Sequence, residues 1–291
     1  MKLLSATLLL LLLAGCASGP RIDTSHSSIG HDSRVQFIVL HYTSTDLPRS
    51  LELLSGRDVS SHYLIGESPA TIYRLVDEDR RAWHAGESEW NGRTWLNATS
   101  IGIELVNQGY EQSADGRRLW YPYSQAQIDA LVVLLKDIMA RHGLKPGAII
   151  GHSDIAPQRK VDPGPLFPWK RLAEEGLVPW PDAGAVAAAQ AHYAAAGLPA
   201  IGWFQEALAA QGYRVPRHGH LDDETRNVIA AFQMKYRPTR FDGEPDAETA
   251  AMLQVLVPRR AADLSSGWCR SVSSRPGPRC GARRQPGIRG R

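Results

Sequence analysis

Cysteine is almost missing from this chain. Three of its 291 residues are cysteines, at positions 16, 269 and 280. So few cysteines exclude a disulfide scaffold. Because no cysteine lies between Ala17 and Trp268, that stretch has neither a thiolate zinc site nor a cysteine nucleophile. Any metal or catalytic site there must be made from other side chains.

The chain also lacks an excess of positive charge outside its C-terminal end. Its formal net charge is +3, but residues 265–291 contain seven arginines and no acid, which leaves −4 for the preceding residues. A nucleic-acid-binding protein usually has a basic folded domain. We therefore expect no nucleic-acid partner. Apolar residues make up 43% of the chain, enough for a sizeable core, and the length predicts about two domains.

The N-terminus begins with an apolar run that is too short to span a membrane. It covers residues 3–13, whereas a bilayer core needs about 20 residues. Leu13-Ala14-Gly15-Cys16 follows directly and resembles a bacterial lipobox. We predict a lipoprotein signal peptide at residues 1–15 and lipidation at Cys16, which would anchor the protein to a membrane. Since Ala17 follows, rather than Asp, we expect the outer membrane, facing the periplasm. The alternative is an ordinary signal peptide with an incidental cysteine.

Composition divides the rest of the chain into segments. Polar, Gly/Ser-rich residues 16–33 are typical of a tether. Residues 34–178 mix strand-like and helix-like patterns, and the Ala-rich stretch that follows makes residues 179–194 a predicted linker. Residues 195–260 form a second unit. Residues 261–291, rich in Arg, Gly, Pro and Ser, are predicted to be a disordered basic tail.

Hydrophobic periodicity predicts an α/β fold for the first unit. Residues 123–143 have helical spacing, a capping box at Ser124 and Gln127 and a stop signal at Gly143. Short apolar runs typical of buried strands cover residues 35–41, 62–65, 71–75, 101–106 and 148–150. We expect a mixed central β-sheet flanked by helices.

The second unit is predicted to be a small all-α domain of three helices. Two Asp-x-x-Thr sequences, Asp222 to Thr225 and Asp246 to Thr249, can each begin a helix. An earlier apolar stretch around residues 203–208 supplies the third helix.

Two hydrophobic strands end in a histidine. These are His41 and His152, and Asp162 follows the second one in a loop rich in proline and glycine. Two imidazoles and one carboxylate can supply three zinc ligands and leave the fourth position to water, whose pKa zinc lowers to around 7. Taken singly, each histidine is more often structural, and the spacing alone leaves that alternative open.

Longer motifs surround these residues. GHSDIAPQRKVDPGP at residues 151–165 contains both His152 and Asp162, and HYT, SHYLI, AWHAG and SIGIEL precede it. Together, in this order, they resemble the zinc-dependent N-acetylmuramoyl-L-alanine amidases of the AmpD/AmiD type, over about residues 35–178. Residues 195–260 resemble the peptidoglycan-binding domain of cell-wall hydrolases. With the lipobox, the likeness is greatest to the family's outer-membrane lipoproteins.

The resemblance implies a site and a reaction. One Zn²⁺ per chain would be held by His41, His152 and Asp162, with Glu104 as the general base and Lys160 stabilising the oxyanion. The implied reaction hydrolyses the amide between N-acetylmuramic acid, in intact or 1,6-anhydro form, and L-alanine in peptidoglycan, for cell-wall turnover or recycling. We expect peptidoglycan, muropeptides and a membrane as partners of a monomer.

Two other functions fit parts of this pattern. A non-catalytic peptidoglycan-recognition protein would share the fold but commonly lacks a zinc ligand, and all three ligands are present here. A structural lipoprotein would leave the motifs around Glu104 and Lys160 unexplained. The sequence has no Gly-x-Ser-x-Gly, which argues against a serine hydrolase.

His62 and His84 are rival candidates for metal binding. We interpret His62 as a packing or outer-shell residue, and by the family likeness His84 belongs to the substrate cleft. All the residues with predicted chemistry precede residue 179. We therefore expect the amidase unit to cleave small soluble substrates without the helical unit.

Overall fold

The computed structural model describes residues 20 and 22–268, with side chains as far as residue 257. The chain divides into two units, residues 1–33 and residues 34–291. In the described part of the first unit there is no helix or strand, and residues 22–32 are exposed. Cys16 and the predicted signal peptide lie outside the described residues. No helix in the described part of the chain is both long and apolar enough to cross a membrane.

The second unit is built on a five-stranded mixed sheet in the order β3-β2-β4-β1-β7. Neighbouring strands in this order run parallel, apart from β2 and β3, which are antiparallel. This confirms the predicted mixed central sheet. The strands are β1 (Phe37–Tyr42), β2 (Tyr63–Ile65), β3 (Ile72–Arg74), β4 (Ser100–Leu105) and β7 (Ile149–Gly151).

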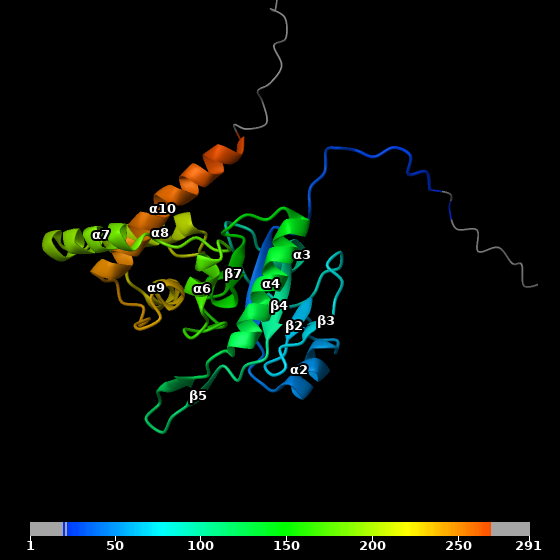
Figure 1. Ribbon diagram of the computed structural model, residues 1–291. Helices are drawn as coiled ribbons and strands as arrows, with labels where there is room; N and C mark the ends of the chain where they lie inside the picture. The colour runs from blue at the N-terminus through cyan, green and yellow to red at the C-terminus, as the bar shows by residue number, and fades with distance from the viewer. Residues whose placement is uncertain (1–19, 21, 269–291) are drawn as a thin grey trace, which may run out of the picture. The chain divides into compact units, whose positions relative to one another are not determined.

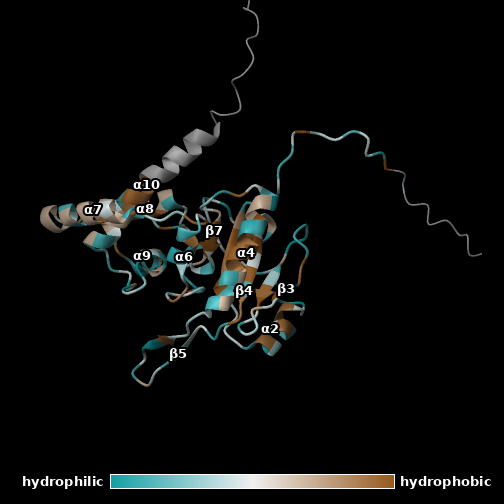
Figure 2. Cartoon of the chain, in the orientation of Figure 1, coloured by the Kyte–Doolittle hydropathy of each residue, from teal (hydrophilic) through white to brown (hydrophobic). Residues whose placement is uncertain are grey.

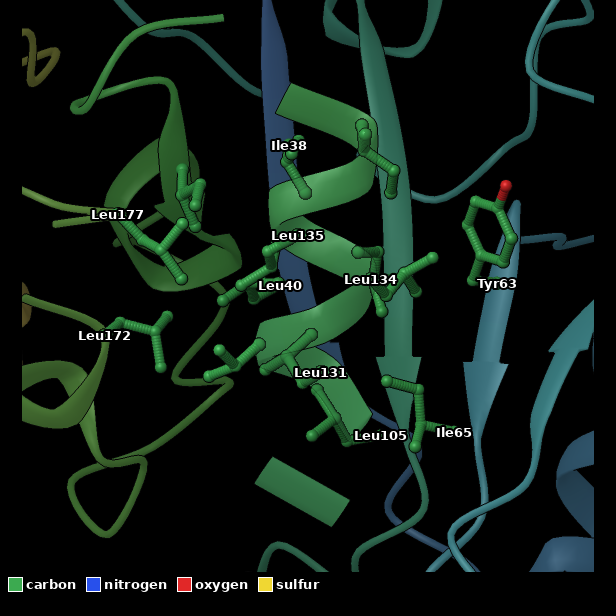
Figure 3. Close-up of a cluster of buried hydrophobic side chains, with 14 of the residues drawn as sticks. Ile38, Leu40, Tyr63, Ile65, Leu105, Leu131, Leu134, Leu135, Leu172 and Leu177 are labelled. Carbon is green, nitrogen blue, oxygen red and sulfur yellow. The ribbon is translucent and has the colours of Figure 1, made fainter. Parts of the chain in front are cut away.

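One face of the sheet is covered by α4 (Gln125–His142), which confirms the predicted long helix (Figure 1). The Ser124 side chain caps its start by accepting from the Gln127 amide, and Gly143 ends it in the left-handed conformation, which glycine adopts easily. Alternate residues of the strands point to this face. Ile38, Leu40 and Leu105 pack there against Leu131 and Leu135 of the helix (Figure 3).

Hydropathy follows this arrangement. Figure 2 shows the central strands in brown, whereas α4 carries both colours. The central strands can be largely apolar because both of their faces are covered. α4 is buried along one side only, and its other side is polar.

The opposite face of the sheet is covered by shorter elements. Strand residues Phe37, Val39 and Ile150 point to this side and belong to a second buried cluster. The other short elements of this region are α2 (Leu47–Leu54), α3 (Leu96–Thr99), the hairpin strands β5 (Tyr110–Gln112) and β6 (Arg118–Trp120) and α5 (His152–Ile155). α6 (Trp169–Glu174) packs instead on the α4 side, where Trp169 and Leu172 join the first cluster.

The C-terminal region is helical, as predicted. The three expected helices are α8 (Ile201–Gln211), α9 (Asp223–Tyr236) and α10 (Ala247–Trp268). The side chain of Asp222 caps α9 by accepting from the Thr225 amide, and Asp246 accepts from the Thr249 amide at the start of α10.

Two segment predictions differ from the structure. The predicted linker at residues 179–194 contains most of a helix, α7 (Ala183–Ala196), because alanine favours helix and Asp182 caps it by accepting from the Ala185 amide. Val186 and Ala189 of α7 are buried with Ala251 of α10. The predicted tail begins at residue 261, yet α10 continues to Trp268. Residues 269–291 lie outside the described residues.

Candidate metal centre

The sheet brings the two predicted metal-binding histidines together. β1 and β7 are parallel neighbours, and their register places Leu40 beside Gly151. His41 follows Leu40 on β1, and His152 follows Gly151 at the start of α5. The loop after α5 then returns Asp162 to the same point. All three side chains are buried.

The three predicted ligand atoms form a compact triangle. His41 Nδ1 lies 2.9 Å from His152 Nδ1 and 3.2 Å from Asp162 Oδ2, and the third side measures 3.0 Å. This is the metal-ligand group found among the residues that the structure describes. Zinc–ligand bonds of 2.0–2.2 Å in a tetrahedron imply ligand–ligand distances of about 3.3–3.6 Å. The triangle is therefore close to the size that a tetrahedral cation needs.

Charge and protonation also suit a cation. Burial, followed by the neighbouring His152, lowers the pKa of His41 to about 4, so this imidazole is neutral at pH 7. Burial opposes ionisation of Asp162, but His152 and His41 outweigh it and hold its pKa below the ordinary value. A neutral imidazole and an ionised carboxylate are the forms that bind metal.

Each metal-facing histidine is held by its other ring nitrogen. His41 Nε2 lies 3.0 Å from His84 Nδ1, and His152 Nε2 lies 3.2 Å from the Ala85 carbonyl oxygen. His84 is therefore behind the triangle and outside the ligand group. Its pKa is well below the ordinary value because it is buried and surrounded by other histidines. Sequence reasoning assigned His84 to the substrate cleft. It does line that cleft, but its contact with His41 was missed.

His62 belongs to the sheet rather than to the metal site. It is fully buried, and its Nδ1 accepts from the Gly102 amide at 3.0 Å. Its Nε2 lies 3.3 Å from the Arg80 carbonyl oxygen. Both ring nitrogens thus contact backbone groups, in agreement with the predicted packing role.

The predicted general base, Glu104, lies next to His41. The two residues are register partners on the parallel strands β4 and β1, so their side chains share a face. Burial, reinforced by the charge of Asp162 and opposed by Lys160, raises the pKa of Glu104 to about 8. Its Oε2 is buried and has no hydrogen-bond partner among the described residues. Such an oxygen is available to accept a proton from a molecule in the cleft.

These residues line one cleft of about 340 Å³. Lys160 lines it too, and its charge lowers the pKa of both Glu104 and His41. The predicted catalytic and metal-binding residues are therefore all in one place, although their roles stay predictions. The cleft is lined by His41, His84, Glu104, His152, Lys160 and Asp162, with Trp83 among its other lining residues.

Helix α5, which carries the predicted ligand His152, also contacts the C-terminal helical region. Asp154, two residues after His152, is 1% exposed. Its carboxylate accepts from the Gly151 amide at 2.9 Å, from the Tyr213 hydroxyl at 2.7 Å and from Lys235 Nζ at 2.6 Å. Lys235 is on α9 and also lies 4.2 Å from the centre of the Trp169 ring. Two of these three donors come from the helical region.

Comparison with known proteins places this geometry in a family. The N-acetylmuramoyl-L-alanine amidase family matches residues 31–165, and the peptidoglycan binding domain family matches residues 198–253. AmiD of Escherichia coli strain K12 is 45% identical over 270 residues, which cover 87% of this chain and 96% of AmiD. The chain belongs to the N-acetylmuramoyl-L-alanine amidase family.

Two solved structures share the whole arrangement. One is the complex of E. coli AmiD with anhydro-N-acetylmuramic acid-L-Ala-D-γ-Glu-L-Lys, with a TM-score of 0.74 and 44% identity over 83% of this chain and 95% of that one. The other is AmpDh3 of Pseudomonas aeruginosa, with a TM-score of 0.76 and 38% identity over 83% and 99%. The chain is thus an enzyme that hydrolyses the amide between N-acetylmuramic acid and L-alanine. This activity decides against the non-catalytic alternatives.

Proposed function

We propose that this amidase works with one zinc ion per chain, held by His41, His152 and Asp162. The observation that carries the proposal is the buried triangle of two imidazole nitrogens and one carboxylate oxygen. The pKa of Asp162 is held low, so its carboxylate carries a negative charge, which a divalent cation would offset. Nitrogen and oxygen ligands in threes are typical of catalytic zinc sites, which keep a position open.

The protein's own residues then divide the hydrolysis between them. A bound zinc ion supplies Lewis-acid polarisation of the amide carbonyl and a nucleophilic water at neutral pH. Glu104 accepts the proton of the attacking water at its unpartnered carboxylate oxygen and returns it to the leaving amine of L-alanine. The ammonium of Lys160 faces the negative charge that develops on the carbonyl oxygen. These steps free the stem peptide from the lactyl group of the glycan.

Both intact and 1,6-anhydro muropeptides are proposed substrates. The E. coli and P. aeruginosa relatives have each been solved with an anhydromuramic peptide. The match to a peptidoglycan binding domain at residues 198–253 supports action on the intact wall as well. We place the activity in cell-wall turnover or recycling.

The proposed location is the periplasmic side of the outer membrane. Its support is the lipobox sequence that ends at Cys16, and Cys16 would carry the lipid anchor on a monomeric chain. Replacing Cys16 with serine should release the protein from the membrane fraction into the soluble periplasm. Retention of Cys16→Ser in the membrane fraction would contradict the anchor.

Product analysis tests the proposed reaction. Purified sacculi and a 1,6-anhydro muropeptide are each incubated with the protein, with and without a chelator, and the products are identified by mass spectrometry. We expect stem peptides that begin with a free L-alanine amine, loss of their release with the chelator, and recovery when zinc is added back. Release that is unaffected by complete metal removal would refute the zinc proposal, and cleavage at another bond would refute the reaction.

A further inference from the structure

A single short segment lies behind both metal-facing histidines. His84 and Ala85 are adjacent in the chain. His84 Nδ1 contacts His41 Nε2, and the Ala85 carbonyl oxygen contacts His152 Nε2. The segment is itself held in place, because the side-chain oxygen of Asn97 accepts from the backbone amides of both His84 and Ala85, at 3.1 and 2.8 Å. Arg159, from the loop that carries Asp162, also donates to the Ala85 carbonyl oxygen, so the segment is held from two sides.

If His41 binds a metal through Nδ1, the hydrogen bonds in this arrangement can have only one direction. A neutral imidazole carries one N–H, so His41 must then have its proton on Nε2. That proton is donated to His84 Nδ1, which leaves the N–H of His84 on its Nε2. His84 Nε2 lies 3.2 Å from Ser100 Oγ, and the Ser100 hydroxyl in turn donates to the Leu96 carbonyl oxygen. Each donor in this series of hydrogen bonds, from His41 to Ser100, therefore has an acceptor.

The strand beneath His84 leaves room for its ring. Gly102 is on β4, and a Cβ atom built on it would lie 2.4 Å from His84 Cγ, well inside contact distance. Gly102 thus allows the imidazole to lie against the sheet, where it meets both His41 on β1 and Ser100 on β4. The ring planes of His84 and His41 are nearly perpendicular, at 81°.

We infer that His84 is a positioning residue that fixes the metal-binding tautomer of His41. A histidine as acceptor differs from the carboxylate or carbonyl that usually fills this role. It adds no charge next to the ion, so the charge of the site is set by its ligands. The inference rests on the proposed metal site and assigns a function to the Trp83–Gly86 motif.

Two substitutions of His84 separate the effect of losing its hydrogen-bond acceptor from the effect of losing the volume of its ring. Leucine and asparagine have similar sizes, but Asn Oδ1 can take the place of His84 Nδ1 as acceptor for His41, whereas leucine cannot. Zinc affinity of the full chain is measured by competition with a chelator for wild type, His84→Leu and His84→Asn. His192→Leu, at an exposed position of α7, serves as the control.

We expect His84→Leu to bind zinc roughly 10–100-fold more weakly than wild type, the usual cost of losing such a contact. His84→Asn should lie within a few-fold of wild type, and His192→Leu should equal it. Equal weakening by leucine and asparagine would overturn the inference, because then only the volume of the ring matters. If wild type itself binds no zinc, the metal site is refuted and the positioning role with it, which distinguishes the two failures.

A second measurement needs no variant. Nitrogen-15 NMR of the histidine rings in the zinc-loaded wild-type protein reports which nitrogen carries each proton. We expect His84 to be the neutral tautomer protonated at Nε2, and His41 to be protonated at Nε2. Protonation of His84 at Nδ1 would overturn the inference even if every variant folds poorly.

Discussion

Glu104, the proposed general base, is a buried carboxylate whose ionised form is costly to the fold. Its carboxylate is placed by the register of β4 beside His41, and burial raises its pKa to about 8. A carboxylate at this place can accept a proton and give it back, and a cation bound beside it would lower its pKa. The same burial makes the ionised form costly in the absence of a cation. The structure therefore gives a reason for a carboxylate at this position that the fold alone does not supply.

Replacing this carboxylate should reduce catalysis and leave the metal in place. Glu104→Gln keeps the size of the side chain but cannot accept the water's proton. We expect turnover of a soluble muropeptide to fall about 10²–10⁴-fold, with zinc content unchanged. Steady-state kinetics together with metal analysis of the same preparation check this. Near-normal turnover would show that another group takes the proton.

The raised pKa also predicts how the stability of the metal-free protein depends on pH. The folded-state pKa of Glu104, about 8, lies above its ordinary value of 4.5. Its contribution to stability is therefore fully present below about pH 4.5 and is lost as pH rises through 8. Urea unfolding of metal-free wild type and Glu104→Gln between pH 5 and 9 should show a difference that grows with pH in favour of glutamine. Parallel curves would mean that Glu104 titrates normally.

The sequence predicted the site residues that belong to a motif. It missed the role of His84, which depends on a contact between distant segments. His41, His152 and Asp162 were predicted as ligands from the family resemblance, and the structure brings their ligand atoms together. The position of His84 behind His41 joins segments 43 residues apart. It depends on the packing of the AWHAG segment over β4, which no local spacing encodes.

At the scale of elements, the important contact is between α5 and α9. α5 carries His152, and the carboxylate of Asp154 in the same short helix is bound by Tyr213 and Lys235. A four-residue helix cannot be stable by itself. Its position therefore depends on these contacts as well as on β7. This connects the helical region to the proposed ligand His152 through one buried ion pair.

Breaking that ion pair should affect both stability and metal binding. Lys235→Met leaves Asp154 buried and charged with fewer donors, and loss of one partner of a buried pair typically costs about 3–5 kcal/mol. We expect this loss in urea unfolding, together with weaker zinc binding because His152 is less well held. Lys170→Met, at an exposed position of α6, is the matched control. A destabilised variant with wild-type zinc affinity would show that the pair does not position His152.

Elements were predicted well where a local signal was strong. The caps of α4, α9 and α10 were read from Ser124, Asp222 and Asp246, and the structure confirms these starts for α4 and α9 and the Asp246 contact for α10. α7 was missed because an Ala-rich stretch after two prolines also fits a linker. What makes it a packed helix is burial against α10, a contact with a segment about 60 residues later.

For the whole molecule, the amidase region and the helical region share a core. Phe37, Val39 and Ile150 of the sheet belong to the same buried cluster as Phe204 and Phe232 of α8 and α9. This argues against the expectation from sequence that the amidase unit is independent. Removing the helices would expose apolar side chains on the face of the sheet that carries the site.

A chain that ends at residue 178 tests this dependence. We now expect it to be less stable than the full chain and to bind zinc more weakly, so that it loses activity on a small soluble muropeptide as well as on sacculi. The loss on sacculi should be larger, since the helical module also raises the local concentration at the wall. Both unlipidated chains are compared on both substrates. Full activity of the short chain on the soluble substrate would restore the view of two independent units.

We expect His41, His152 and Asp162 to hold one catalytic zinc ion. The decisive measurement is the zinc content and amidase activity of wild type and His152→Ala, purified in parallel and measured on the same samples. Two ligands rarely hold a catalytic zinc ion, so we predict one zinc per chain in wild type and loss of both metal and activity in the variant. Full zinc occupancy in His152→Ala would contradict the claim and move the ligand role to another histidine.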